Sequence, residues 1–153
     1  MNLGDVLRKE REKRGFDTPE TADRMNVSEE EYLEMEGGES PAEDWGPTLA
    51  QLAISLETPT SRLLAPSGRA ADTRPGQAGE LIAERREAKG LSAEDLAREV
   101  GLDPDDYAQV EAGESPIEIY GPRLLAFAET VEIPVFNLFY PCGLPFQELD
   151  DYP

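Results

Sequence analysis

Apolar residues recur at helical spacing in short segments, and glycine, asparagine or proline interrupts each segment. Residues 3–14 begin with the apolar stripe Leu3, Val6 and Leu7 and continue into a charged run, so they predict a first helix that ends at Gly15. No later segment has the alternation that is typical of strands. The pattern therefore predicts an all-α fold.

Four more helices are expected between this one and Pro66. Their boundaries are set by residue types with known preferences at helix ends: an N-terminal capping residue, a tight turn that tolerates left-handed backbone, a second cap, a stop, and two proline starts. In chain order these are Asp17, Asn26, Ser28, Gly38, Gly46-Pro47 and Pro59. The fourth helix is thus expected to begin at Gly46-Pro47, and a short fifth helix at Pro59.

The whole pattern returns after 75 positions. Residues 4–66 align with residues 79–141 without a gap, and twenty aligned positions are identical. A period of this length exceeds the roughly 20 to 50 residues of solenoid repeats and matches two copies of one small domain. We therefore predict two tandem five-helix domains at residues 1–65 and 77–141, a linker at 66–76 and a tail at 142–153.

Two interpretations remain open for the aromatic residues near the end of the second copy. They could form a docking or dimerisation surface, or they could belong to a fifth helix packed on its own domain. These residues are Phe136, Phe139, Tyr140 and Phe146. Each copy is near the lower size limit for an independent fold, so we also expect some burial between the copies.

Charge is the strongest feature of the composition. The chain has 33 acidic and 14 basic residues, which gives a net charge of −19. Such a field repels nucleic acid and anionic lipid at long range and favours basic partners. Solubility, or adaptation to a salty cytoplasm, is an alternative reason for the acidity.

The remaining composition limits the classes of function. With no histidine, one cysteine (Cys142) and no phosphate-binding glycine motif, the sequence offers neither a catalytic triad nor a zinc site. We expect no enzyme activity, no cofactor and no metal. No apolar run approaches the roughly 20 residues that span a bilayer, so we expect no membrane association and a cytoplasmic location.

The order of these elements resembles the Cro/lambda-repressor-like, or Xre, family of helix-turn-helix proteins. The resemblance covers nearly all of both copies. It rests on a Leu/Ile-x-x-x-Arg stripe in the first helix, an alanine in the second, the capped turn between the second and third, and a glutamate before the sequence GES-P. The matching residues are Leu7 with Arg11, Ile82 with Arg86, Ala22, Ala97, Asn26–Ser28, Gly101–Asp103, Glu36 and Glu111.

The resemblance implies a structural role for four of these residues. In this family an arginine of the first helix pairs with a glutamate of the third, which gives the pairs Arg11–Glu36 and Arg86–Glu111 here. It also implies that Tyr32 and its equivalent in the second copy lie in the core. The expected fold is therefore two lambda-repressor-like helix-turn-helix domains.

The third helices differ from those of the family's operator-binding members. Such members place this helix in the major groove and use small polar and basic residues on it. Here the corresponding interaction face is acidic or neutral: Glu29, Glu30, Glu31, Glu34, Asp105, Asp106 and Gln109. Because specific DNA binding needs many phosphate contacts, conventional operator binding by these helices is disfavoured.

A basic cluster lies on the first helix. It contains Arg8, Lys9, Lys13 and Arg14. One interpretation is a solvated helix face with intrahelical pairs to nearby glutamates, and the other is a nucleic-acid contact.

Three functional hypotheses follow. The leading one is a regulatory protein whose acidic third helices contact a basic or transcription-related protein partner. The second is a DNA-binding repressor in which the two copies act as a built-in dimer, and a homodimer of the chain also remains open. The third is a protein that mimics the charge pattern of DNA.

Overall fold

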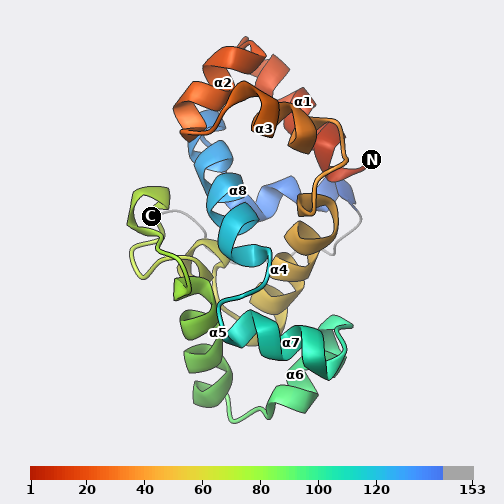
Figure 1. The fold of residues 1–153 in the computed structure, drawn as a ribbon, viewed down its shortest axis with the longest axis vertical. Coiled ribbons are helices and arrows are strands. Elements are labelled where there is room, and N and C mark those ends of the chain that lie inside the picture. The colour runs from red at the N-terminus through yellow and green to blue at the C-terminus, as the bar shows by residue number, and fades with distance from the viewer. Residues whose placement is uncertain (143–153) are drawn as a thin grey trace.

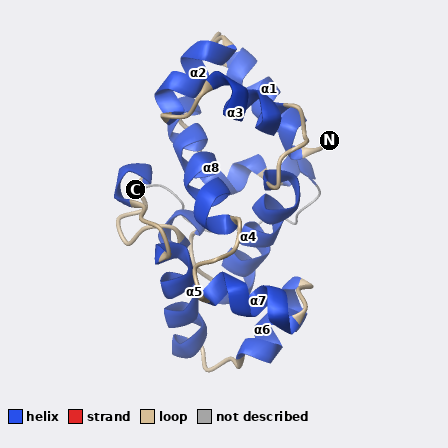
Figure 2. Ribbon diagram, viewed as in Figure 1, coloured by secondary structure: helices blue, strands red, loops and turns tan. Residues whose placement is uncertain are grey.

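The computed structural model describes residues 1–142, and the regular secondary structure of this part of the chain is helical, with loops between the helices (Figure 2). It contains no strand, which confirms the all-α expectation for the described residues. The α-helices are α1 (Leu3–Lys13), α2 (Thr18–Met25), α3 (Glu29–Glu36), α4 (Ala42–Leu56), α5 (Gln77–Ala88), α6 (Ala93–Val100), α7 (Pro104–Glu111) and α8 (Ile117–Val131). The 3₁₀ helices are η1 (Thr60–Leu63), η2 (Ala70–Asp72), η3 (Val135–Leu138) and η4 (Tyr140–Cys142).

Each repeat forms three short helices followed by one long helix and a 3₁₀ turn. We call α1–α3 the first unit and α5–α7 the second unit. The two units lie at opposite ends of an elongated molecule, and α4 and α8 lie between them (Figure 1).

The long helices are exchanged between the repeats. Helix α4 packs on α6 of the second unit, and α8 packs on α2 of the first unit, while α4 and α8 also pack on each other. Each unit is therefore covered by the long helix of the other repeat. The boundaries 1–65 and 77–141 describe the repeat in sequence, and a division into two separate domains stays a prediction.

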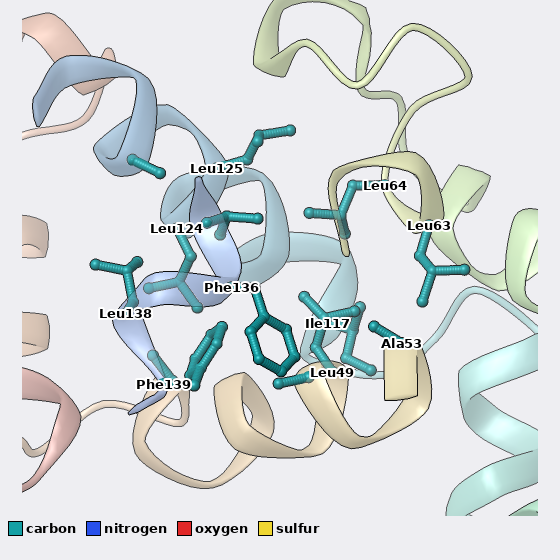
Figure 3. Close-up of a cluster of buried hydrophobic side chains, with 14 of the residues drawn as sticks. Leu49, Ala53, Leu63, Leu64, Ile117, Leu124, Leu125, Phe136, Leu138 and Phe139 are labelled. Atoms are coloured by element: carbon teal, nitrogen blue, oxygen red, sulfur yellow. The ribbon is translucent and has the colours of Figure 1, made fainter. Parts of the chain in front are cut away.

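A single hydrophobic cluster joins the two repeats at the place where α4 and α8 meet. Figure 3 shows side chains from both repeats in this cluster, from α4, η1, α8 and η3. Close approach is possible because both long helices carry a glycine here. A Cβ added at Gly121 would lie 2.6 Å from Leu64 Cδ2, and one at Gly46 would lie 3.0 Å from the ring of Phe139.

The expected start of the fourth helix was wrong in both repeats. Helix α4 begins at Ala42 and α8 at Ile117, so Pro47 and Pro122 lie inside the helices. A proline strains a helix partly through its clash with the Cβ of the preceding residue, and the preceding residue is glycine in both repeats. Gly-Pro is therefore compatible with the helix interior. It marks the place where α4 and α8 pack on each other and not the place where these helices begin.

The aromatic residues after α8 belong to the core. Phe136 and Phe139 are buried, and η3 packs on α8 of its own repeat and also on α1 of the first unit. For these residues the docking interpretation is wrong, because the apolar surface is already covered. Tyr140 is half-buried, with its ring 5.2 Å from that of Phe136. Phe146 and residues 143–153 of the predicted tail lie outside the described residues.

The linker at 66–76 packs along α8. Its 3₁₀ helix η2 contacts α8, and the backbone N–H of Ala70 donates to Glu129 Oε2 at 2.9 Å. Since α8 also covers the first unit, the linker lies beside that unit and helps to form a cleft there.

Candidate functional site

Local side-chain hydrogen bonds position the turn and third helix of the first unit. Asp17 caps α2 by accepting from the N–H of Glu20 at 2.8 Å, and Asn26 ends the helix with a left-handed φ of 61°. Ser28 and Glu31 then form a reciprocal capping box at the start of α3. The capping box of Ser28 and Glu31 thus sets the start of α3 and the position of the side chains in its first turn.

The second unit repeats this plan with different residues. Gly101 takes the left-handed turn with a φ of 76°. Asp103 caps α7 by accepting from the N–H of Asp106 at 2.8 Å, and Pro104 occupies the first turn. Both turns were expected from residue type alone.

A part-buried ion pair ties the first helix of each unit to the third. Arg11 donates to Glu36 through Nε at 2.9 Å and Nη2 at 2.8 Å, and through Nη1 to the carbonyl of Phe16. Arg86 makes the same fork to Glu111, at 2.6 and 3.2 Å. The four residues therefore stand where the resemblance places them.

These pairs shift the pKa values of their members. Hydrogen bonds to Glu36 raise the pKa of Arg11. Burial opposes ionisation of Glu36 most strongly, but the hydrogen bonds and charge of Arg11, together with the nearby Tyr32 hydroxyl and Arg8, outweigh it, so the pKa of Glu36 lies below its usual value. Glu111 behaves in the same way beside Arg86, and Tyr107 also donates a hydrogen bond to it. Both carboxylates are thus held ionised.

The acidic face of α3 is exposed but partly neutralised at its first turn. Glu29, Glu30 and Glu34 are exposed. Thr18 donates to Glu29 at 2.7 Å, and Arg123 of α8 donates to Glu31 at 2.7 Å. Hydrogen bonds from Ser28, with the nearby charge of Arg123, lower the pKa of Glu31.

The equivalent face of α7 has no such neutralisation in the part of the chain that the structure describes. Asp105, Asp106 and Gln109 are exposed, and neither aspartate pairs with a basic side chain among residues 1–142. The negative charge of Asp103, together with some desolvation, raises the pKa of Asp106. This face carries fewer carboxylates than that of α3, but without a basic partner among residues 1–142.

The basic cluster of α1 is engaged mainly with acidic neighbours. Arg8 lies 3.3 Å from Asp5, and Lys13 lies 3.1 Å from Glu10. Arg14 pairs with Glu132 at the end of α8, at 2.9 Å. Lys9 is exposed and makes no ion pair within residues 1–142. The intrahelical pairs expected on this face are present, and Arg14 adds a contact between the repeats.

One cleft was not foreseen from the sequence. It has a volume of about 560 Å³ and opens between the turn after α2, the linker and α8; we call it the α8 cleft. Arg24 and Arg123 stand on its walls. The alignment of the two copies could have pointed to this site, because Arg24 and Arg123 are basic where the other copy has Glu99 and Thr48. The exchange of the long helices, which brings Arg123 to the first unit, could not be read from that alignment.

Neither a metal-ligand group nor a membrane-spanning helix is found among the described residues. Within residues 1–142, no three histidine, cysteine or acidic side chains are grouped so that they could hold a metal ion. No helix in this range combines the length and apolar character needed to cross a bilayer.

Comparison with known families gives one match. Residues 77–131 match a family model described as a helix-turn-helix domain. This part of the second repeat is thus similar to a helix-turn-helix domain. The matched residues run from the start of α5 to the end of α8, so they contain α6, the turn at Gly101 and α7.

A domain of this kind is typical of DNA-binding transcription regulators and not of enzymes. No curated protein and no solved structure matches the chain.

Proposed function

We propose that this chain is an Xre-like transcriptional regulatory protein that acts mainly through protein contacts. In this proposal the first unit is a second helix-turn-helix copy, and α3 and α7 of the two copies contact a basic partner. The observation that carries it is the exposed surface of both third helices, which bears acidic, apolar and amide side chains and no basic one.

Electrostatics supports a protein partner over DNA. Duplex DNA presents dense negative charge, and a helix in its groove lies close to the flanking phosphates. Glu29, Glu30 and Glu34 would meet those phosphates in the first unit, and Asp105 and Asp106 would meet them in the second. A basic protein surface meets the same carboxylates with attraction.

The alternative is a repressor that binds DNA with both units as a built-in dimer. The arrangement of two units fixed at opposite ends by α4 and α8 favours it, since operators often repeat across a two-fold axis (Figure 1). Arg8, Lys9, Lys13 and Arg14 would then supply phosphate contacts, at the cost of their present ion pairs. DNA mimicry and a homodimer of the whole chain also stay predictions, as does a cytoplasmic location.

The proposal is tested with a defined basic probe. A fluorescently labelled nona-arginine peptide is titrated with the full chain and with E30Q/E34Q, which removes two exposed charges from α3. The matched control is E80Q/E84Q, which removes two exposed charges from α5. We expect at least about a fivefold weaker affinity for E30Q/E34Q, and less than about a twofold change for the control.

A different result would contradict the proposal. Equal losses for both variants would mean that the probe senses only the net charge of −19. The third helices would then hold no special place as a contact face, and the proposal would fail.

A further inference from the structure

The α8 cleft has the size of a small-molecule site. Its volume of about 560 Å³ lies within the roughly 300 to 1,000 Å³ of ligand pockets in proteins. Three parts of the chain that are distant in sequence form its walls: the turn after α2, the linker and α8. A ligand held there would touch all three parts at once.

The lining combines an apolar surface with a few charged groups. Met25, Val27, Pro122 and Ala126 supply apolar surface. Arg24, Arg123, Glu31 and Glu129 supply the charges, so the formal charges of these four cancel. The cleft thus brings two guanidinium groups together in a chain whose net charge is −19.

Arg24 and Arg123 each have N–H groups that remain available to a ligand. Within residues 1–142, Arg123 donates only through Nη2, to Glu31, and its guanidinium lies 5.2 Å from the ring centre of Tyr120. In the same part of the chain, Arg24 donates only through Nη2, to Glu20 at 3.3 Å, while its guanidinium lies 4.5 Å from the ring centre of Phe16. Each guanidinium is oriented by an aromatic ring and retains further N–H groups for an acceptor.

We propose that the α8 cleft binds a small organic anion, a carboxylate or phosphate ester on a compact apolar body. Arg24 and Arg123 hold the anionic group, and the apolar body lies on the surface formed by Met25, Val27 and Ala126. Guanidinium groups suit this role because they bind carboxylates and phosphates through paired N–H donors.

The pair of arginines is not repeated at the aligned positions of the two copies. The residues aligned with Arg24 and Arg123 are Glu99 and Thr48, so the equivalent place in the second repeat lacks both cations. The repeat alone therefore does not explain the two arginines.

Binding has a consequence for the first unit. The incoming anion shares Arg123 with Glu31, which belongs to the first turn of α3, and its charge repels that carboxylate. A bound ligand therefore weakens the Arg123–Glu31 pair beside the proposed contact face. The site itself does not depend on whether the partner of that face is a protein or DNA.

Isothermal titration calorimetry on the full chain tests the site with three probes. Phenyl phosphate and benzoate carry the proposed chemistry, and benzyl alcohol has a similar apolar body without the charge. We expect saturable binding of at least one anion, with a dissociation constant below about 5 mM, and no saturation by benzyl alcohol. Which anion binds more tightly distinguishes a phosphate from a carboxylate ligand.

Four variants locate the binding. R24Q and R123Q are each expected to weaken it at least about tenfold, and A126F is expected to abolish it by filling the cleft. R98Q, on the exposed surface of the second unit, is the control and should change nothing. Circular dichroism verifies that each variant is folded.

The sharpest variant is E31Q. If the ligand competes with Glu31, removing that charge strengthens binding, by about threefold or more. A purely structural role for the Arg123–Glu31 pair predicts no such gain. The inference is overturned if no anion saturates up to about 10 mM, if R24Q and R123Q bind as the unaltered chain does, or if E31Q weakens binding.

Discussion

The two units share a backbone plan and an Arg–Glu pair, but the surroundings of their third helices differ. In the first unit, Thr18 donates to Glu29, and Arg123 donates to Glu31. The residues aligned with these two pairs are Ala93 with Pro104 and Thr48 with Asp106, so the hydroxyl of Thr18 and the guanidinium of Arg123 have no equivalent there. A cleft of about 300 Å³ opens beside Ala93 and Pro104.

This comparison separates residues that maintain the fold from residues that set the surface. The caps, the left-handed turns and the Arg–Glu pairs recur in both units because each unit needs them to hold its helices. The groups that neutralise the acidic helices do not recur. Among residues 1–142, the acidic face of α7 therefore lacks the cationic partner that α8 supplies to α3 through Arg123.

The largest expected loss of stability comes from substitutions in the shared core, where the two units should respond alike. Leu52 of α4 and Phe127 of α8 are aligned in the repeat, and both are fully buried. L52A and F127A should lower the free energy of unfolding by about 2–5 kcal/mol, with the larger loss for F127A. Because α4 and α8 are exchanged, each variant should destabilise both units together, in one transition, as measured by urea denaturation with circular dichroism.

Hydrogen exchange monitored by mass spectrometry provides the check on this prediction. F127A should reduce protection in α6 and α7 as well as in α2 and α3. Loss of protection confined to one unit would show that the exchanged helices do not couple the two.

The second largest loss of unfolding free energy is expected from breaking the part-buried Arg–Glu pairs. R11M and R86M each leave a glutamate without its partner, so each should cost about 2–4 kcal/mol of unfolding free energy. The first pair is less exposed, with its side chains at 13% and 11% compared with 16% and 20% for the second, so R11M should cost more. Thermal denaturation of both variants measures the order, and the double variants R11M/E36M and R86M/E111M should recover part of the loss.

Acid should weaken these same pairs. The pKa values of Glu36 and Glu111 are lower in the folded state than in the unfolded chain, so their contribution is present above about pH 4.5 and is lost as the pH falls through the folded-state values. The stability difference between the unaltered chain and E36Q or E111Q should therefore shrink below about pH 4.5. Denaturant titrations at pH 7 and at pH 3.5 measure it, and a difference that stays constant would contradict the assigned pKa directions.

The smallest effect is expected from making the two units alike. R123T gives the first unit the residue of the second, and T48R does the reverse. Because Glu31 is 44% exposed, R123T should cost no more than about 1 kcal/mol of unfolding free energy. It should increase amide exchange in the first turn of α3, whereas T48R should decrease exchange at the start of α7, where Asp106 gains a cation. Unchanged exchange in both places would mean that these charges do not shape the two faces.

Much of the local structure could be predicted from sequence. Asn26 and Gly101 mark the turns because few other residues accept a positive φ, and Ser28 and Asp103 mark the caps because their side chains accept from backbone N–H groups. The Arg11–Glu36 pair required the family resemblance, since it joins residues that are far apart in the chain. These features depend on residue types or on one recurring contact.

The arrangement of the long helices could not be predicted in the same way. Apolar side chains such as Leu49 and Leu52 indicate that α4 is buried, but not which repeat buries it. Gly46-Pro47 is a common helix start, and the sequence does not reveal that Gly46 instead lies inside α4, in close contact with Leu3, Leu124 and Phe139. The α8 cleft was missed for the same reason, because it exists only when α8 reaches the first unit.

The most direct test of the proposed function is the affinity of the full chain for duplex DNA of random sequence. Fluorescence anisotropy at low salt, followed by a salt titration, measures it. The account predicts no saturable binding by the unaltered chain, and weak binding at most by E30Q/E34Q. Saturable binding by the unaltered chain, with an affinity that falls steeply with salt concentration, would demonstrate phosphate contacts and contradict the account in favour of the repressor.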